Sequence, residues 1–205
     1  MEVKKSDRAY HHGDLRNALI DAGLTALETQ DAADLSLRAL ARSVGVSANA
    51  AYRHFSDKDA LLGALAAEGF RRFARDQAAT GTHALNADQA LASGLRYVLF
   101  AQRHPGLFKL MFGQFLHARN DPVLQDAAMQ SFAQLLVQSR PPEPDGSVPS
   151  GPPDDATLLR ALAKWGLVHG LSHLLLEGQL DILGATTPER LTAILEASGL
   201  GDTRR

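Results

Sequence analysis

The sequence predicts an all-α fold, in which a small N-terminal unit of three helices (residues 1–56) precedes a larger helical bundle (residues 57–205). Ala and Leu each occur 33 times, whereas Val, Ile and Thr together reach only 20. Strong helix formers therefore far outnumber the β-branched residues that favour strands. Apolar residues recur every three to four positions, and no stretch shows the sustained alternation of a half-buried strand. These observations together favour helices throughout.

The N-terminal unit is expected to contain one longer helix followed by two short ones. Apolar residues at helical spacing mark the first helix over residues 14–30. Ser36 can cap a second, short helix, because a serine hydroxyl accepts hydrogen bonds from the free N–H groups of a first turn. Gly45 then supplies the permissive backbone of a tight turn, and Ser47 can cap the third helix.

The rest of the chain is expected to form a bundle of longer helices. The first of them starts at Ser56 or Asp57. Later helical or apolar segments are expected at residues 87–102, 107–115, 122–139, 154–179 and 188–199. The His-Pro-Gly run at 104–106 is expected to end one helix and separate it from the next apolar segment. Residues 140–153 hold six of the nine prolines, which predicts a flexible surface loop.

Composition excludes several classes of protein. The 205-residue chain has a formal net charge of −2 and contains no cysteine. A disulfide scaffold, a Cys-ligated zinc or iron–sulfur site and a cysteine nucleophile are therefore excluded. No apolar stretch approaches the ~20 residues of a membrane span, and the N-terminal segment lacks the apolar core of a signal peptide. We expect a soluble, cytoplasmic protein that does not associate with membranes.

The three N-terminal helices have the pattern of a helix-turn-helix motif, since two short helices joined by a glycine-containing turn follow a longer one. The second helix of such a pair lies in the major groove of double-stranded DNA while its other face stays in the core. Opposite Ala51 and Phe55, this helix would present Ala48, Asn49, Tyr52 and Arg53. An asparagine amide reads base edges, and the hydroxyls of Ser47 and Tyr52 suit phosphates.

Basic residues cluster in the same segment, although the whole chain is slightly acidic. The charged residues of 36–58 are Arg38, Arg42, Arg53, Lys58 and, as the single acid, Asp57. Four basic residues against one acid leave a local net charge of +3 before His54 is counted. Lys58 stands in the first turn of a helix, where a cation opposes the macrodipole unless an anion such as phosphate binds there. Ordinary solvated charges are the plainer alternative.

The run LSLRALARSVGVSANAAYRHFSDKDALLGAL resembles the N-terminal domain of the TetR family of bacterial transcriptional regulators, and the resemblance covers about residues 10–65 without a gap. It implies that Ser47, Tyr52, His54 and Lys58 contact phosphates and that Asn49 lies where base contacts are common. It also implies that basic residues ahead of the first helix, in the segment YHHGDLR, reach the DNA backbone or the minor groove.

Two later segments, YVLFAQRHPGLFKLMFG and KWGLVHGL, are similar to the C-terminal domain called WHG after its signature residues, here Trp165, His169 and Gly170. This resemblance covers roughly residues 88–180 and implies a homodimer formed through the last two helices. The helix over 154–179 agrees with it, because a helix that is apolar nearly all round must be buried all round. Burial inside a monomeric bundle is the alternative.

A small-molecule pocket is expected in the C-terminal bundle, chiefly because ligand-responsive domains are usual in the family. The candidate residues are Phe100, Met111, Phe112, Phe115, Phe132, Trp165, His169 and His173. Apolar residues at this spacing also suit a plain core. The two histidines share one helix face at a spacing that suits a metal, but no acidic residue is expected nearby on that face. A histidine that polarises a ligand group is preferred, and neither a metal nor another cofactor is expected.

The sequence therefore predicts a DNA-binding regulator: a homodimeric repressor that leaves its operator when an unknown small molecule binds the C-terminal domain. An activator, or a regulator without a ligand, is the alternative. An all-α carrier or an enzyme is a remote one. The chain contains no metal-ligand set, nucleophile elbow, glycine-rich phosphate loop or carboxylate pair on one helix, so no catalytic residue is expected.

Overall fold

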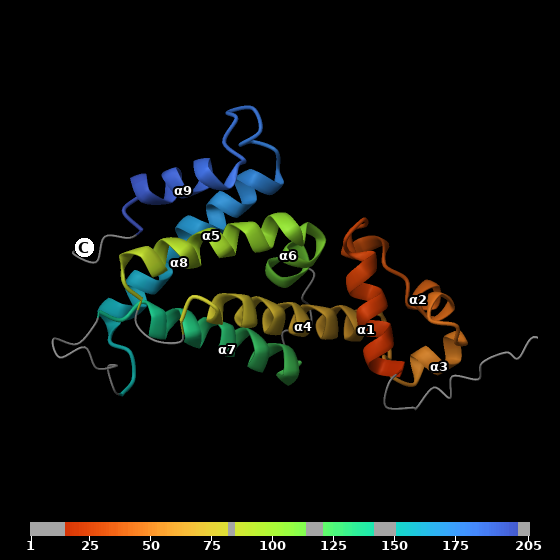
Figure 1. The fold of residues 1–205 in the computed structure, drawn as a ribbon. Coiled ribbons are helices and arrows are strands. Elements are labelled where there is room, and N and C mark those ends of the chain that lie inside the picture. The colour runs from red at the N-terminus through yellow and green to blue at the C-terminus, as the bar shows by residue number, and fades with distance from the viewer. Residues whose placement is uncertain (1–14, 82–84, 114–120, 142–150, 201–205) are drawn as a thin grey trace, which may run out of the picture.

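The computed structural model describes residues 15–81, 85–113, 121–141 and 151–200, and all regular structure within these ranges is helical. The all-α prediction is thereby confirmed. Figure 1 shows α1, α2 and α3 gathered at one end of the molecule, while α4 runs from that end into a bundle formed by the remaining helices.

The N-terminal unit follows the predicted order of one longer and two short helices. It consists of α1 (Leu15–Ala26), the 3-10 turn η1 (Ala32–Asp34), α2 (Leu37–Ser43) and α3 (Ala48–Tyr52). The first helix ends four residues earlier than predicted, because hydrogen bonds tighten to i−3 spacing at Glu28 and Thr29. Ser36 stands at the N-cap of α2, but its side chain makes no capping hydrogen bond. Gly45 adopts φ = +79° in the turn, as its predicted role requires.

Among the described residues of the C-terminal part there are six helices, and their bounds follow the sequence pattern closely. They are α4 (Lys58–Ala78), α5 (Ala87–Arg103), α6 (Pro105–Phe112), α7 (Pro122–Gln138), α8 (Asp155–Leu176) and α9 (Pro188–Ala197). The break predicted at 104–106 is a single residue, His104, because Pro105 occupies the first turn of α6, where its missing N–H costs nothing. None of the described helices has the length and apolarity that a membrane crossing requires.

Helix α4 packs against both the N-terminal unit and the C-terminal bundle. Its first half packs on α1, where a Cβ placed on Gly23 would lie 2.8 Å from a methyl carbon of Leu65. Its middle packs on α6, where a Cβ on Gly69 would lie 2.7 Å from the sulfur of Met111. Helix α7 packs along α4, and α5 connects this layer to α8 and α9. One hydrophobic core therefore runs from the N-terminal unit into the bundle.

A second close contact joins the bundle to the N-terminal unit. The start of α6 approaches the end of α1 so closely that a Cβ on Gly106 would collide with the carbonyl oxygen of Leu27. Helix α6 also packs against η1. The N-terminal unit is thus held by both α4 and α6.

Candidate DNA interface and ligand pocket

Ser47 fixes the start of α3 in the predicted manner. Its side-chain oxygen accepts a hydrogen bond from the backbone N–H of Ala50 at 3.2 Å. Ala51 is fully buried, and Phe55 is buried just beyond the helix with the guanidinium of Arg16 over its ring, 5.3 Å from the ring centre. Packing therefore holds the inner face of α3 and determines which side chains face outward.

The outward side chains of α3 are polar. Asn49, Tyr52 and Arg53 are exposed, while Ala48 and His54 are half-buried. Tyr52 keeps 41% of its surface exposed, although a tyrosine usually buries most of its ring. An amide, a phenol and a guanidinium on one short helix are the groups that bind base edges and phosphates, so this surface is chemically suited to DNA.

Asp57, rather than Ser56, begins α4. Its carboxylate accepts hydrogen bonds from the backbone N–H of Ala60 at 2.8 Å and from the Ser56 hydroxyl at 2.9 Å. These two hydrogen bonds, the one from Ala60 first, hold the pKa of Asp57 below its usual value. The carboxylate is therefore engaged with the helix terminus beside the candidate DNA surface.

Lys58 is positioned by the N-terminal unit itself. Its ammonium group donates a hydrogen bond to the carbonyl oxygen of Ala33 in η1, which holds the side chain next to the start of α4. A neutral carbonyl leaves the positive charge uncompensated. Within the described ranges Lys58 forms no ion pair, and neither do the exposed Arg38, Arg42 and Arg53. Residues 36–58 around α3 therefore present four cations without ion pairs against a single acid, a balance that favours a polyanion.

A cavity of about 390 Å³ lies within the C-terminal bundle, lined chiefly by residues of α4, α5, α7 and α8, with Phe112 from the end of α6. Its volume falls within the range of roughly 300–1,000 Å³ that is typical of small-molecule sites. Three of the predicted pocket residues line it, namely Phe112, Phe132 and Trp165. The other candidates lie elsewhere, and much of the wall comes from residues that the sequence did not single out.

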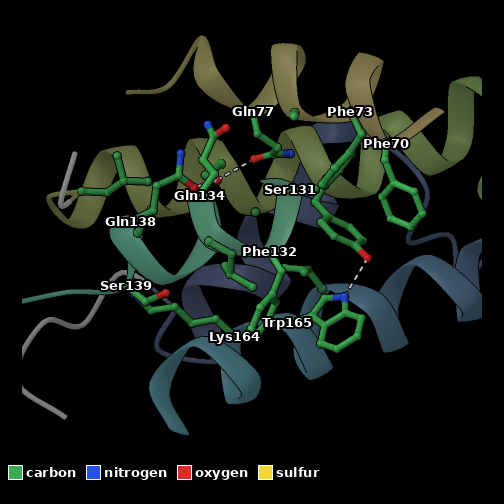
Figure 2. A pocket seen from close by; sticks show the side chains of 18 of the residues that line it. Phe70, Phe73, Gln77, Ser131, Phe132, Gln134, Gln138, Ser139, Lys164 and Trp165 are labelled. Carbon is green, nitrogen blue, oxygen red and sulfur yellow. Dashed lines mark hydrogen bonds between the residues drawn. The ribbon is translucent and has the colours of Figure 1, made fainter. Parts of the chain in front are cut away.

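The cavity has two chemically different ends. Figure 2 shows Phe70, Phe73 and Trp165 toward one side, which we call the aromatic end. It shows Gln138 and Ser139 toward the other side. We call this side the polar end and count Gln134 and Lys164, two further polar residues of the cavity wall, as part of it. A molecule that fills the cavity therefore meets apolar rings along one part of its length and hydrogen-bonding groups along the other.

Four candidate pocket residues do not line the cavity, and a fifth cannot be placed. Phe100 and Met111 are core residues, 3% and 2% exposed, since α5 and α6 turn these positions toward α4. His169 and His173 lie on α8 outside the cavity wall. Phe115 lies outside the described residues.

Two hydrogen bonds connect His169 through Tyr97 to Trp165 in the cavity wall. The indole N–H of Trp165 donates to the Tyr97 hydroxyl at 3.0 Å, and the same hydroxyl lies 2.9 Å from Nδ1 of His169. Because Tyr97 accepts from Trp165, its own O–H is free to donate to the histidine. Burial raises the pKa of Tyr97 well above its usual value, while burial, with a smaller effect of His173, lowers that of His169. A neutral histidine suits the role of acceptor.

The surroundings of His173 differ from the expectation. Its ring centre lies 4.7 Å from that of His169, as the i,i+4 spacing predicts. An acidic residue does lie nearby, because the Glu177 carboxylate, one turn further along, is 3.9 Å from Nδ1 of His173. These two histidines and the carboxylate are not placed to hold an ion together, and the described part of the chain contains no group of three or more such side chains that is.

Sequence reasoning missed the polar residues around the cavity. The Ser93 hydroxyl lies 2.7 Å from the side-chain amide of Gln77. Gln138 is buried, and its amide donates to the carbonyl oxygen of Gly81 at 2.7 Å. A polar residue on the apolar face of a helix is the one signal in the sequence that points to such positions. Gln77, Ser93 and Gln138 show it, but only the fold brings the three helices together.

Comparison with known proteins adds independent information. Residues 19–65 match the family described as "Bacterial regulatory proteins, tetR family", and residues 90–197 match the family described as "Tetracyclin repressor-like, C-terminal domain". The second match covers more than half of the chain and contains Trp165, His169 and Gly170.

Curated relatives and a solved structure are also similar. The chain is 33% identical over 132 residues to the nucleoid occlusion factor SlmA of Photobacterium profundum, in an alignment that covers 61% of this chain and 64% of that relative. It is 31% identical over 144 residues to SlmA of Vibrio vulnificus, covering 67% of each chain. A protein of unknown function from Rhodococcus sp. RHA1 has the same fold, with a TM-score of 0.74, 32% identity, and coverage of 93% of this chain and 96% of that one.

Proposed function

Since the chain belongs to the TetR family of bacterial regulatory proteins and is a DNA-binding regulator, we propose that it works as a homodimeric repressor that a small molecule releases from its operator. Membership in this family also agrees with the expectation that the chain is not an enzyme.

The recognition surface is proposed to be the outer face of α3 together with the start of α4. Asn49 would contact base edges in the major groove, while Ser47, Tyr52, His54 and Lys58 would contact phosphates, with Ala48, Arg38 and Arg53 beside them. Support comes from the exposure of Asn49 and Tyr52 and from the unpaired positive charges around them. Phosphate contacts of this kind fix orientation, and base contacts give sequence preference.

A second copy of the chain is proposed to cover the outer face of α8. Apolar and small residues follow one another along this face at helical spacing, namely Leu159, Leu162, Gly166, Gly170 and Leu174. Both glycines have open space where a Cβ would point, so a neighbouring helix can approach closely. Ile182 and Leu183, in the connection to α9, are 88% and 75% exposed. A contiguous apolar surface of this kind is typical of an interface between proteins.

The observation that carries the ligand-responsive part of the proposal is the course of α4. This one helix of 21 residues, about 30 Å long at 1.5 Å per residue, starts beside the recognition helix and ends in the cavity wall. Lys58 stands at its first position, while Phe70, Phe73 and Gln77 line the cavity. A ligand that prefers a shifted α4 would change the distance between the two recognition helices of a dimer, and affinity for the operator would fall.

A gel-shift titration with the DNA upstream of the chain's own gene tests the proposal. We expect a shifted complex at nanomolar to micromolar protein that unlabelled upstream DNA displaces and unrelated DNA does not. Light scattering on the free protein should give twice the mass of 22.0 kDa. Absence of a specific complex, or a monomer in solution, would contradict it.

A second candidate function is DNA binding without a small-molecule ligand. It is favoured by the relatives named nucleoid occlusion factors, whose name refers to the nucleoid and to no ligand. The two candidates differ in whether a small molecule in the cavity is needed to release the DNA. If no small-molecule fraction of a cell extract releases the DNA from the wild-type protein, the ligand-free candidate is preferred.

A further inference from the structure

We infer that the cavity is built for an amphipathic organic anion: a molecule with an aromatic or bulky apolar body and one carboxylate or sulfonate group, the latter bound at the polar end by Lys164, Ser139 and Gln134. This inference rests on the proposed function for calling the molecule an effector. The site itself is argued from the cavity alone.

The polar end contains buried groups that lack a hydrogen-bond partner within the described residues. Ser139 is 3% exposed, and its hydroxyl oxygen has no such partner. The amide nitrogen of Gln134 is likewise buried and unpartnered. Leaving a buried donor unsatisfied costs about 1–3 kcal/mol. The amide nitrogen can only donate and the hydroxyl is able to donate, so both groups are suited to a ligand atom that accepts.

Charge then distinguishes an anion from a neutral acceptor. Lys164 is the only charged residue among the described residues that line the cavity, and it forms no ion pair within the described ranges. The nearest cation on the same helix, Arg160, donates from Nε to the backbone carbonyl of Ser139 at 3.4 Å. Lys164 therefore borders the polar end without a carboxylate of the cavity wall to balance it, and Arg160 contacts the backbone at the same end.

The surroundings of Lys164 affect the ionisation of its side chain. Burial, with a smaller contribution from Arg160, lowers the pKa of its ammonium group. A bound carboxylate would relieve both effects, because it pairs the charge and forms charge-assisted hydrogen bonds, which are about twice as strong as neutral ones. A neutral ligand would satisfy Gln134 and Ser139 but would leave Lys164 unpaired.

The aromatic end defines the rest of the molecule. Phe70, Phe73, Phe132 and Trp165 line it, and Phe132 meets Trp165 edge-on with ring centres 6.2 Å apart. Faces and edges of aromatic rings favour another ring over a flexible polar chain. The volume of about 390 Å³ accommodates a small aromatic ring system together with its anionic group.

Two dyes that share one aromatic frame test the inference. The dye 1-anilinonaphthalene-8-sulfonate carries an anionic group, and N-phenyl-1-naphthylamine lacks it. Trp165 is the only tryptophan of the chain, so quenching of its fluorescence reports binding beside it. In the full-length protein, Lys164→Met should weaken binding of the sulfonate dye roughly tenfold and leave the neutral dye within about twofold. Lys164→Arg should retain most of the affinity for the sulfonate dye.

One further site variant and one matched control complete the experiment. Ser139→Ala should weaken binding of the sulfonate dye by a smaller factor, since it removes one neutral donor. Lys109→Met changes an exposed lysine of α6 outside the cavity wall and should change neither affinity. Thermal unfolding of each variant verifies that the fold is retained.

Several outcomes would overturn the inference. Equal weakening of both dyes by Lys164→Met would mean that the residue shapes the cavity, and no weakening would mean that it binds no anion. Failure of both dyes to quench Trp165 in the wild-type protein would mean that the cavity does not accept an aromatic amphipath. The gel shift keeps the two proposals separable: dye selectivity without a DNA complex refutes only the proposed function, and a DNA complex without dye selectivity refutes only this inference.

Discussion

The indole nitrogen of Trp165 lies 3.0 Å from the hydroxyl oxygen of Tyr97, a hydrogen bond that ties α8 to α5 at the wall of the cavity. Tyr97 is almost completely buried, and its ring also packs edge-on against Phe73 with centres 5.0 Å apart. One phenol therefore fixes the position of an α8 indole and an α4 ring together.

Tyr97→Phe is expected to destabilise the protein by about 1–3 kcal/mol, because the buried indole N–H and the Nδ1 atom of His169 both lose their partner. Urea unfolding followed by circular dichroism measures the loss. Tyr52→Phe removes an exposed hydroxyl and should leave the unfolding free energy nearly unchanged. An equal effect of the two substitutions would show that the Tyr97 hydrogen bonds add no stability.

Lys58→Ala and Tyr52→Phe are each expected to weaken operator binding. A lost phosphate contact at Lys58 should reduce the slope of log affinity against log salt by about one. Titrations at two salt concentrations measure both quantities. Lys109→Ala, on the bundle, is the matched control, and an unchanged affinity for both variants would rule out the proposed phosphate contacts.

Asn49→Ala is expected to relax base preference at one position of each half-site. A bidentate amide–base contact discriminates by about 1–3 kcal/mol, so the loss is large enough to see in a pool of randomised operators. Selection from such a pool with the wild-type and variant proteins gives the two preferred sequences. Identical preferred sequences would show that Asn49 does not contribute to base recognition.

Leu159→Lys is expected to convert the dimer to a monomer, because it places a charge in the apolar face of α8 that the second copy would cover. Light scattering after size exclusion measures the mass. Val123→Lys changes a similarly exposed apolar residue on α7 and should leave the dimer intact. If both variants remain dimeric, the outer face of α8 is not the interface.

Acidification from about pH 7 to about pH 5 is expected to lower stability. Burial lowers the pKa of both His169 and His104, so the unfolded chain binds protons at a higher pH than the folded chain does. The contribution of each histidine is complete above its unfolded pKa, near 6.5, and is lost progressively as the pH falls from there through the lower folded pKa. Urea midpoints at the two pH values measure the effect, and His169→Gln should reduce it. A constant midpoint would contradict the prediction.

The helices could be predicted from the sequence because their signals are local. Asp57, Asn86, Asp121, Asp154 and Thr187 accept capping hydrogen bonds, and prolines occupy the first turns of α6, α7 and α9. The serine at the start of α3 is a further case. Such caps depend on neighbours three residues away, which the sequence contains in full.

The cavity could be predicted only in part because its wall is set by tertiary packing. Phe100 and Phe112 look alike in the sequence, yet one is in the core and the other lines the cavity, since their helices turn them toward different neighbours. The sequence did not identify Lys164 as a cavity residue, because a lysine on a helix is ordinarily exposed to solvent. Only the arrangement of α7 against α8 encloses it.

The packing of Leu65 over Gly23 restricts how this protein can be recombined with its relatives. A cut at residue 57 would remove the first turns of α4, and with them Leu61 and Leu65, from the core of the N-terminal unit. A hybrid regulator that combines this DNA-binding unit with another C-terminal domain should therefore be joined beyond Leu65, where the match to the family's N-terminal domain also ends. Exchange at that point transfers a complete folding unit, whereas exchange at the loop before α4 leaves each parent with half of a shared helix interface.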